Sequence, residues 1–340
     1  MMRQVQYTRF GEPTEVLEVV EAAVPEPGPG QVAITLEAAP VHLADLKHIQ
    51  GLPWFDGYRP PQVPGYEGVG RVSRLGQGVS GWSVGDRVFL PVSFGAWRDV
   101  SIVPAADLWR APEHIDAAQL ALLPINLTTA WLMLDAIVTL KPGDWVMQNA
   151  ANSNVGYYII RLARRLGVKT VNVVRSQERV ADLAAAGGDV NLVDGPDLAA
   201  RVRGAIGDGA VRLAFDAVAG DATERLAACL GEAGGTVAVY GLLSGQPCAV
   251  APERLMFADV RVVGFYTART LVDLTPDQHR EMRQSLERYL HDDPPHSPIA
   301  GIYPFDRVRE AVAHAARTQH DRVGKIILTP NTPATAEAAP

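Results

Sequence analysis

The chain has 340 residues but only two cysteines, Cys229 and Cys248. Two cysteines are too few for a disulfide framework, and neither belongs to a Cys-x-x-Cys pattern of the kind that holds metals. Long apolar runs are also absent: no stretch approaches the roughly 18 uninterrupted apolar residues of a membrane span, and residues 1–10 lack the apolar core of a secretory signal. We therefore expect a globular protein located in the cytoplasm, in which neither cysteine carries function.

The chain also lacks a strong excess of charge of either sign. The 31 Lys and Arg residues against 38 Asp and Glu residues give a formal net charge of −7, and no long basic run occurs. This balance argues against nucleic acid or an anionic membrane as the main partner. A small molecule is the expected partner, and a hydrophobic content of 47% over this length is enough for about two domains.

The distribution of proline and of apolar runs divides the chain. Residues 1–122 contain 12 of the 25 prolines and short alternating apolar runs such as 32–36, which predict a compact β-rich domain. In residues 123–268, apolar runs alternate with Ala-, Leu- and Arg-rich helical segments, a pattern typical of βαβ units and a doubly wound parallel sheet. The strands that we predict there cover 145–150, 170–174, 190–193, 213–218, 236–240 and 260–265.

Residues 269–330 have a third pattern, with two helical segments followed by a strand. We predict helices over 276–290 and 306–317 and a last strand over 325–329, and we expect this segment to return to the first domain. The tail, 331–340, is rich in Pro, Thr and Ala without periodicity and is expected to be disordered.

The polar stretch 148–156 joins the first predicted strand of the second domain to a helix expected over 155–166. In dinucleotide-binding folds, the backbone N–H groups of such a loop and the positive end of the helix hold the pyrophosphate. Gly156 occupies the position of the close-packing glycine, whereas Ala151, Ser153 and Asn154 stand where glycines are often found. An ordinary strand-turn-helix with a polar turn is the alternative. The candidate cofactor-binding residues of the loop are Asn152, Ser153, Asn154, Val155 and Gly156.

The end of the second strand distinguishes between two cofactors. An NAD site carries an Asp or Glu about 20 residues beyond the glycines, whereas an NADP site carries cationic donors for the 2′-phosphate. The residue 19 positions after Gly156 (175 − 156) is Arg175, followed by Ser176 and Arg179. A guanidinium suits a phosphate dianion, so these residues predict NADPH, although a solvated arginine at a strand end is the alternative.

With these residues, six segments in order resemble the medium-chain dehydrogenase/reductase superfamily over residues 5–329, and within it the zinc-independent branch of quinone oxidoreductases and 2-enoyl thioester reductases. The segments are 49–51, 64–70, 95–98, 125–130, 148–156 and 172–175. The resemblance implies an α/β protein: a GroES-like β-rich catalytic domain over 1–122 and a Rossmann domain with a doubly wound parallel sheet over 123–268. It also implies cofactor contacts from Asn126, Thr129, Tyr240, Gly241, Leu242, Phe265, Tyr266 and Lys325.

Zinc-dependent relatives take a catalytic metal from cysteine and histidine, and a structural metal from four closely spaced cysteines. This chain has no cysteine before position 229, and Tyr66 stands where those relatives place a histidine. A second group of possible ligands, His291, Asp292, Asp293 and His296, lies in a proline-rich segment. We interpret that group as a solvated loop and predict no metal.

Without a Lewis acid, the natural reaction is hydride transfer to a carbon that is already electron-poor. Enoyl thioester reductases are known for a proton-donating tyrosine just after the segment that matches 49–51, but here Pro53 and Trp54 stand at that place. Tyr58 is the candidate replacement, as a proton donor or as an aromatic lid residue, and Trp54 is expected to wall the pocket. His42, where relatives usually carry asparagine, is either a donor to substrate or a buried histidine with satisfied hydrogen bonds.

The leading hypothesis is an NADPH-dependent reductase of an activated C=C bond in a 2-enoyl thioester or enone. The alternatives are an NADPH:quinone oxidoreductase and a non-catalytic NADPH-binding protein of the crystallin or sensor type. Relatives of this branch are commonly dimers joined at the edges of their Rossmann sheets, so we expect a homodimer that pairs through residues 260–265.

Overall fold

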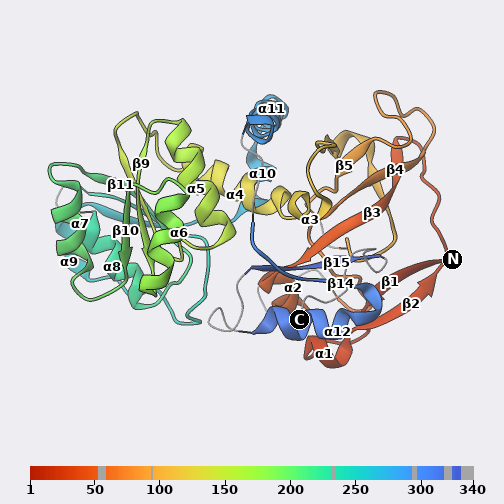
Figure 1. Cartoon of the computed structure of the whole chain (residues 1–340), viewed down its shortest axis with the longest axis horizontal. Helices are drawn as coiled ribbons and strands as arrows, with labels where there is room; N and C mark the ends of the chain where they lie inside the picture. The colour runs from red at the N-terminus through yellow and green to blue at the C-terminus, as the bar shows by residue number, and fades with distance from the viewer. Residues whose placement is uncertain (53–58, 93–94, 231–233, 293–296, 318–323, 331–340) are drawn as a thin grey trace. The chain divides into compact units, whose positions relative to one another are not determined.

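A computed structural model describes residues 1–52, 59–92, 95–230, 234–292, 297–317 and 324–330 (Figure 1). The chain forms two compact units. The first unit contains Met1–Ile125 and Arg280–Pro340, and the second contains Asn126–His279. The expected disordered tail, 331–340, lies outside the described residues.

The described part of the first unit is built on an open sheet of seven strands in the order β14-β15-β3-β4-β5-β7, with β6 also paired to β3. Strand β3 (Gln31–Val41) is the longest, and the late strand β15 (Lys325–Thr329) pairs with it antiparallel. The other strands of the unit are β1 (Met2–Gln6), β2 (Glu18–Ala22), β4 (Val69–Leu75), β5 (Arg87–Phe89), β6 (Val100–Pro104), β7 (Trp109–Arg110) and β14 (Ile299–Pro304). Its helices are α1 (Pro13–Val16), α2 (Leu43–Ile49), α3 (Ala117–Leu120), α12 (Val308–Ala316) and the larger part of α11 (Pro276–Asp292).

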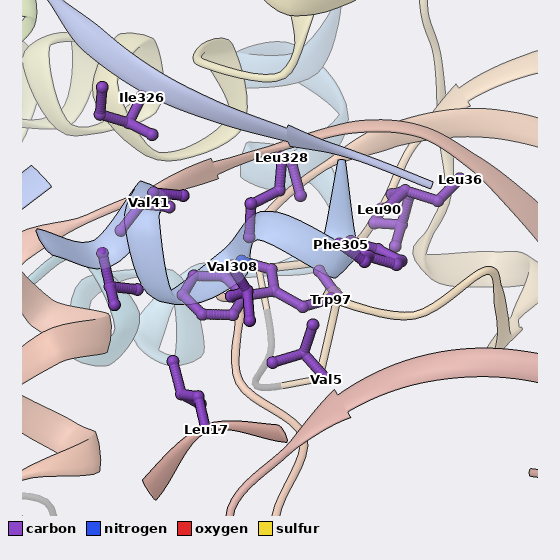
Figure 2. Packing of buried hydrophobic residues seen from close by; sticks show 14 of the residues in the cluster. Val5, Leu17, Leu36, Val41, Leu90, Trp97, Phe305, Val308, Ile326 and Leu328 are labelled. Atoms are coloured by element: carbon purple, nitrogen blue, oxygen red, sulfur yellow. The ribbon is translucent and has the colours of Figure 1, made fainter. Parts of the chain in front are cut away.

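The core of the first unit collects side chains from segments far apart in the sequence, as Figure 2 shows. Leu36 of β3, Leu328 of β15 and Phe305 contribute to it together with Trp97. Trp97 is fully buried and donates from Nε1 to the carbonyl of Pro40 at 3.2 Å. Gly65 is required beside this ring, because its φ is +100° and a Cβ there would lie 2.3 Å from the indole.

The second unit is a six-stranded parallel sheet in the order β10-β9-β8-β11-β12-β13. The chain starts at β8, adds β9 and β10 on one side and then returns to add β11, β12 and β13 on the other. This confirms the predicted doubly wound sheet, in which ligands bind at the carboxyl ends of the strands next to the switch point. The strands are β8 (Trp145–Gln148), β9 (Lys169–Val174), β10 (Val190–Val193), β11 (Val211–Asp216), β12 (Gly235–Val239) and β13 (Val260–Gly264). The helices are α4 (Leu123–Asp135), α5 (Asn154–Arg165), α6 (Val180–Ala185), α7 (Leu198–Ile206), α8 (Asp221–Cys229), α9 (Pro252–Phe257) and α10 (Thr267–Asp273).

Two of the predicted strands end two residues early for local reasons. Strand β8 stops at Gln148, because Ala150 adopts a φ of +46° and turns the chain out of the sheet. Strand β11 stops at Asp216, whose carboxylate accepts the N–H groups of Val218 and Ala219 and so forms a turn. Helix α10 and strand β14 were not predicted from the sequence. Strand β14 contains glycine and proline and forms through its pairing with β15.

Within the described residues, no helix combines the length and the apolar character needed to cross a membrane.

Candidate functional site

The loop after β8 forms a tight turn into α5. Ser153 is the N-cap of α5, and its Oγ accepts a hydrogen bond from the N–H of Gly156 at 3.1 Å. A Cβ on Gly156 would lie only 2.3 Å from the carbonyl oxygen of Ala151, so this position excludes every side chain. The free N–H groups of the first turn of α5 and the helix dipole therefore point at whatever binds at this loop.

Two buried hydrogen-bond donors lie beside this loop. They are Asn154 Nδ2, in the first turn of α5, and Tyr240 Oη, just after β12. Burial raises the pKa of the Tyr240 phenol, and a hydrogen-bonding interaction with the side chain of Ser153 lowers it, so Tyr240 lies beside the N-cap residue of α5. Asn154 Nδ2 has no acceptor among the described residues, and a buried donor without an acceptor is costly, so it fits a ligand that presents acceptor oxygens, as a pyrophosphate does.

Side-chain amides anchor the start of the loop to the strands on both sides. Gln148 Nε2 donates to Asn172 Oδ1 of β9 at 2.8 Å and to the carbonyl of Gly156 at 3.0 Å. Asn149 Nδ2 donates to Asp216 Oδ1 of β11 at 2.6 Å, and its Oδ1 accepts from the N–H of Ala217 at 2.8 Å. These hydrogen bonds hold the start of the loop in one conformation.

Asp216 is the centre of this anchoring and was missed by the sequence analysis. Its carboxylate is fully buried and accepts the N–H groups of Val218 and Ala219, each at 2.9 Å, and the hydroxyl of Thr223 at 2.6 Å. The signal in the sequence was a single acidic residue at the end of an apolar strand, which a buried strand tolerates only when hydrogen bonds satisfy it.

The end of β9 carries the predicted phosphate-binding residues. Arg175 follows the strand directly and is exposed, Ser176 is half-buried and precedes the short 3-10 turn Gln177–Arg179. Arg179 Nη1 lies 3.4 Å from Asp182 Oδ2, a largely exposed pair of small energetic value. Because β8 and β9 are parallel neighbours, these residues and the loop after β8 lie at the same end of the sheet, where the strands have their carboxyl ends.

Except for Lys325, the residues expected near the nicotinamide belong to the second unit. Asn126 is buried on α4, and Thr129 Oγ1 on that helix lies 2.6 Å from Thr267 Oγ1 at the start of α10. Just before Thr267, the N–H of Phe265 donates to the carbonyl of Val239, and Tyr266 is exposed. These contacts connect α4 with the segment that follows β13.

Gly241 and Leu242 follow Tyr240 after β12. The N–H of Gly241 donates to the carbonyl of Asp216, and a Cβ on Gly241 would lie 2.5 Å from the carbonyl oxygen of Ala217. Leu242 is 50% exposed. The backbones after β11 and β12 thus approach so closely that a glycine is needed.

The catalytic candidate His42 lies in the first unit, where its Nε2 is 2.5 Å from Oε1 of the fully buried Glu67. The other oxygen of Glu67 accepts the N–H of Ile125 at 2.6 Å. Asp45 is also buried, accepts the backbone N–H of His42 at 2.7 Å, and has its pKa raised to about 6 by burial. The contact with Glu67 favours the alternative of a buried, hydrogen-bonded histidine over a donor to substrate.

The remaining candidates lie elsewhere. Tyr58 and Trp54 are outside the described residues. Lys325 opens β15 in the first unit, where its N–H donates to the carbonyl of Pro298. Among the described residues, no group of three or more His, Cys, Asp or Glu side chains is arranged to hold a metal, and of the earlier ligand candidates Asp293 and His296 are not described.

Comparison with known proteins identifies the two parts of the chain. Residues 28–113 match the model of the alcohol dehydrogenase GroES-like domain, and residues 154–288 match that of the zinc-binding dehydrogenase domain. A mitochondrial enoyl-[acyl-carrier-protein] reductase of Caenorhabditis elegans is 34% identical over 297 residues, covering 85% of this chain and 84% of the relative. The human mitochondrial enoyl-[acyl-carrier-protein] reductase is 32% identical and covers 84% and 78%, respectively.

Solved structures of other proteins are similar to this chain over nearly its whole length. A protein of Bacillus thuringiensis assigned as an NADPH:quinone reductase has a TM-score of 0.88 at 25% identity and covers 97% of this chain and 99% of its own. Etr1p, a 2-enoyl thioester reductase of Candida tropicalis solved with NADP and crotonyl-CoA, has a TM-score of 0.83 at 25% identity and covers 96% and 99%. The predicted fold class, a GroES-like domain with a Rossmann domain, is confirmed.

The expectation of a cytoplasmic location is wrong by the same comparison, because the curated relatives are mitochondrial enzymes. The expectation depended on the absence of an apolar run in residues 1–10, and that absence does not specify a compartment.

Proposed function

This chain belongs to the zinc-independent branch of the medium-chain dehydrogenase/reductase superfamily, and on that premise we propose that it is an NADPH-dependent reductase of an activated C=C bond in a 2-enoyl thioester or enone. The observation that carries the proposal is the combination of a closed, donor-rich turn at Gly156 with a guanidinium at the end of the next strand. That combination suits a dinucleotide with a 2′-phosphate. The proposed reaction is inferred from the enoyl reductases among the relatives of this chain.

We assign the pyrophosphate to the first turn of α5, with Asn152, Ser153 and Asn154 around it and Tyr240 as an additional donor. Arg175, supported by Ser176 and Arg179, would hold the 2′-phosphate, because a guanidinium forms paired hydrogen bonds to phosphate. The family resemblance implies contacts to the nicotinamide end of the cofactor, and we assign these contacts to Asn126, Thr129, Gly241, Leu242, Phe265, Tyr266 and Lys325. The contact between Thr129 and Thr267 supports this assignment by joining two of these segments.

NADPH supplies the hydride in such a reaction. The tasks left to the chain are to position the substrate, to stabilise the enolate oxygen that develops, and to deliver a proton. We propose Tyr58 for the proton, with Trp54 as a wall of the pocket. For His42 we propose a positioning role, since its Nε2 is engaged by Glu67.

A quinone oxidoreductase is the second candidate, favoured by the similarity to the Bacillus thuringiensis protein. Steady-state NADPH oxidation with crotonyl-CoA, with 1,4-benzoquinone and without substrate separates the candidates. Reduction of crotonyl-CoA with conversion to butyryl-CoA supports the enoyl reductase. Turnover with quinone alone supports the second candidate, and NADPH binding without any turnover would leave a non-catalytic protein.

We also propose that the protein is a homodimer joined at β13. This strand is the last of the six-stranded sheet, and Val262 and Val263 on it are 36% and 38% exposed. In the preceding helix α9, Met256 and Phe257 are 70% and 78% exposed. An apolar edge strand next to exposed apolar side chains suits pairing with a second copy. Val262→Asp is expected to give monomers in sedimentation velocity, and a wild-type protein that sediments as a monomer at micromolar concentration would contradict the proposal.

Finally, we propose the domain boundaries and domain roles that the sequence predicts. Residues 1–122 with 269–330 form the catalytic domain, and residues 123–268 form the NADP-binding domain.

A further inference from the structure

A carboxylate lies beside the proposed phosphate site. Strands β9 and β10 are parallel neighbours with Val174 opposite Val193, and the N–H of Asp194 donates to the carbonyl of Val174 at 2.7 Å. Asp194 therefore continues β10 at the level where Arg175 continues β9, and neighbouring strands lie only about 5 Å apart. A negative charge at this position would repel the 2′-phosphate that Arg175 is proposed to bind.

Arg225 neutralises this carboxylate. From α8, which follows β11, its Nε donates to Asp194 Oδ1 at 2.8 Å and its Nη2 donates to Asp194 Oδ2 at 2.6 Å. The two side chains are only 31% and 25% exposed, so the pair is partly shielded from solvent. The fork occupies both oxygens of Asp194, and the hydrogen bonds to Asp194 raise the pKa of Arg225.

The surroundings make this neutralisation necessary. Asp194 and Arg225 line a cavity of about 600 Å³ together with Asp221 and Glu224. Glu224 has a partner of its own, since Arg254 Nε lies 3.2 Å from its Oε1. Because Glu224 is paired with Arg254, Arg225 is left to balance the other two carboxylates of the lining, Asp194 and Asp221, and without it the end of β10 would be negative.

We propose that Arg225 is a specificity-determining positioning residue for NADPH, which keeps Asp194 neutralised and directed away from the phosphate bound by Arg175. In its absence, Asp194 would repel the dianion and compete with it for the Arg175 guanidinium. NADH has no 2′-phosphate and would be affected little. The inference rests on the proposed NADPH-dependent function.

The test is direct binding of NADPH and NADH, measured by fluorescence titration on the full chain, so no substrate is needed. Arg225→Gln is expected to raise the Kd for NADPH by about tenfold and the Kd for NADH by less than about twofold. The second substitution of Asp194→Asn in the same chain is expected to restore the NADPH preference, because it removes the charge that Arg225 no longer balances. Arg225→Lys, which keeps the charge, should retain most of the preference.

Arg212→Gln is the matched control, since it removes one positive charge from an exposed position at the opposite, amino end of β11. It should leave the ratio of the two Kd values unchanged. Equal losses for NADPH and NADH in Arg225→Gln, or no recovery in the double variant, would overturn the inference. If the wild-type protein binds neither dinucleotide, the proposed function itself fails. If it prefers NADPH and Arg225→Gln leaves that preference intact, only the role of Arg225 fails.

Discussion

Replacing Asn149 by aspartate tests the anchoring of the cofactor loop with almost no change in shape. In the wild-type protein, Asn149 Nδ2 donates to Asp216 Oδ1 at 2.6 Å, and both side chains are at most 4% exposed. In Asn149→Asp, the donor becomes an acceptor and two carboxylates face each other away from water. They can remain in contact only by sharing a proton, as carboxylate pairs do.

The size of the effect follows from the distance. Two unit charges that relax to about 4 Å repel each other by about 4 kcal/mol at an effective dielectric constant of about 20. This repulsion raises the upper pKa of the pair by about 3 units, since one unit corresponds to about 1.4 kcal/mol. A carboxyl whose pKa is raised on folding favours the folded state while it is protonated. The variant should therefore lose stability as pH rises, by about 1.4 kcal/mol per pH unit between about pH 4 and 7, to a total of about 4 kcal/mol.

Urea unfolding at pH 5 and pH 8 measures this dependence, with the wild-type curves as reference. The swapped variant, Asn149→Asp with Asp216→Asn, restores one carboxylate and one amide and should recover most of the loss at pH 8. A destabilisation of Asn149→Asp that is the same at both pH values would refute the reasoning, because it would have to come from packing instead of charge.

Three further substitutions test other parts of the site. Arg175→Ala is expected to raise the KM for NADPH by about tenfold or more and to change the KM for NADH little. Equal effects on the two KM values in steady-state kinetics would contradict the phosphate assignment. Gly156→Ala places a Cβ 2.3 Å from the carbonyl oxygen of Ala151, so we expect a loss of about 2–4 kcal/mol in urea unfolding and weaker NADPH binding. An unfolding midpoint equal to that of the wild type would show that the turn can open. For Asp45, whose pKa is raised to about 6, the folded state favours the protonated acid, so wild-type stability falls as pH rises from about 4 to 6. Asp45→Asn should remove this slope in unfolding curves at pH 4 and 7, where a full effect would be about 3 kcal/mol, and an unchanged slope would assign it to other groups.

Much of the second unit could be read from the sequence, because its features are local. The six strands and α5 follow from apolar runs and helical periodicity, and the structure places each of them within a few residues of the prediction. Gly156 was predicted as a cofactor-loop residue from its place after the first strand, and Arg175 as a phosphate-binding residue from its separation of 19 residues (175 − 156), and both roles stay predictions. The strand ends were less accurate, since they depend on the turn at Ala150 and on the hydrogen bonds of Asp216.

The partners of the polar side chains could not be read in this way. Asn149 and Asp216 are 67 residues apart, and Asp194 and Arg225 are 31 apart. A sequence shows that a side chain is charged or polar, but the order of the strands in the sheet decides which of these groups meet at its carboxyl edge. His42 is an example: its sequence position allowed either a donor to substrate or a buried, hydrogen-bonded histidine, and only the fold shows that its Nε2 lies against Glu67.

The sequence by itself therefore determined the kind of fold and the cofactor class, and it predicted the two residues proposed to bind the cofactor most directly, because spacing along a strand and a helix fixes where a turn and a strand end fall. Only the tertiary structure decided which charges are neutralised around that site. Charge neutralisation depends on distances of a few ångströms between segments that are remote in the chain, and those distances exist only once the sheet has formed.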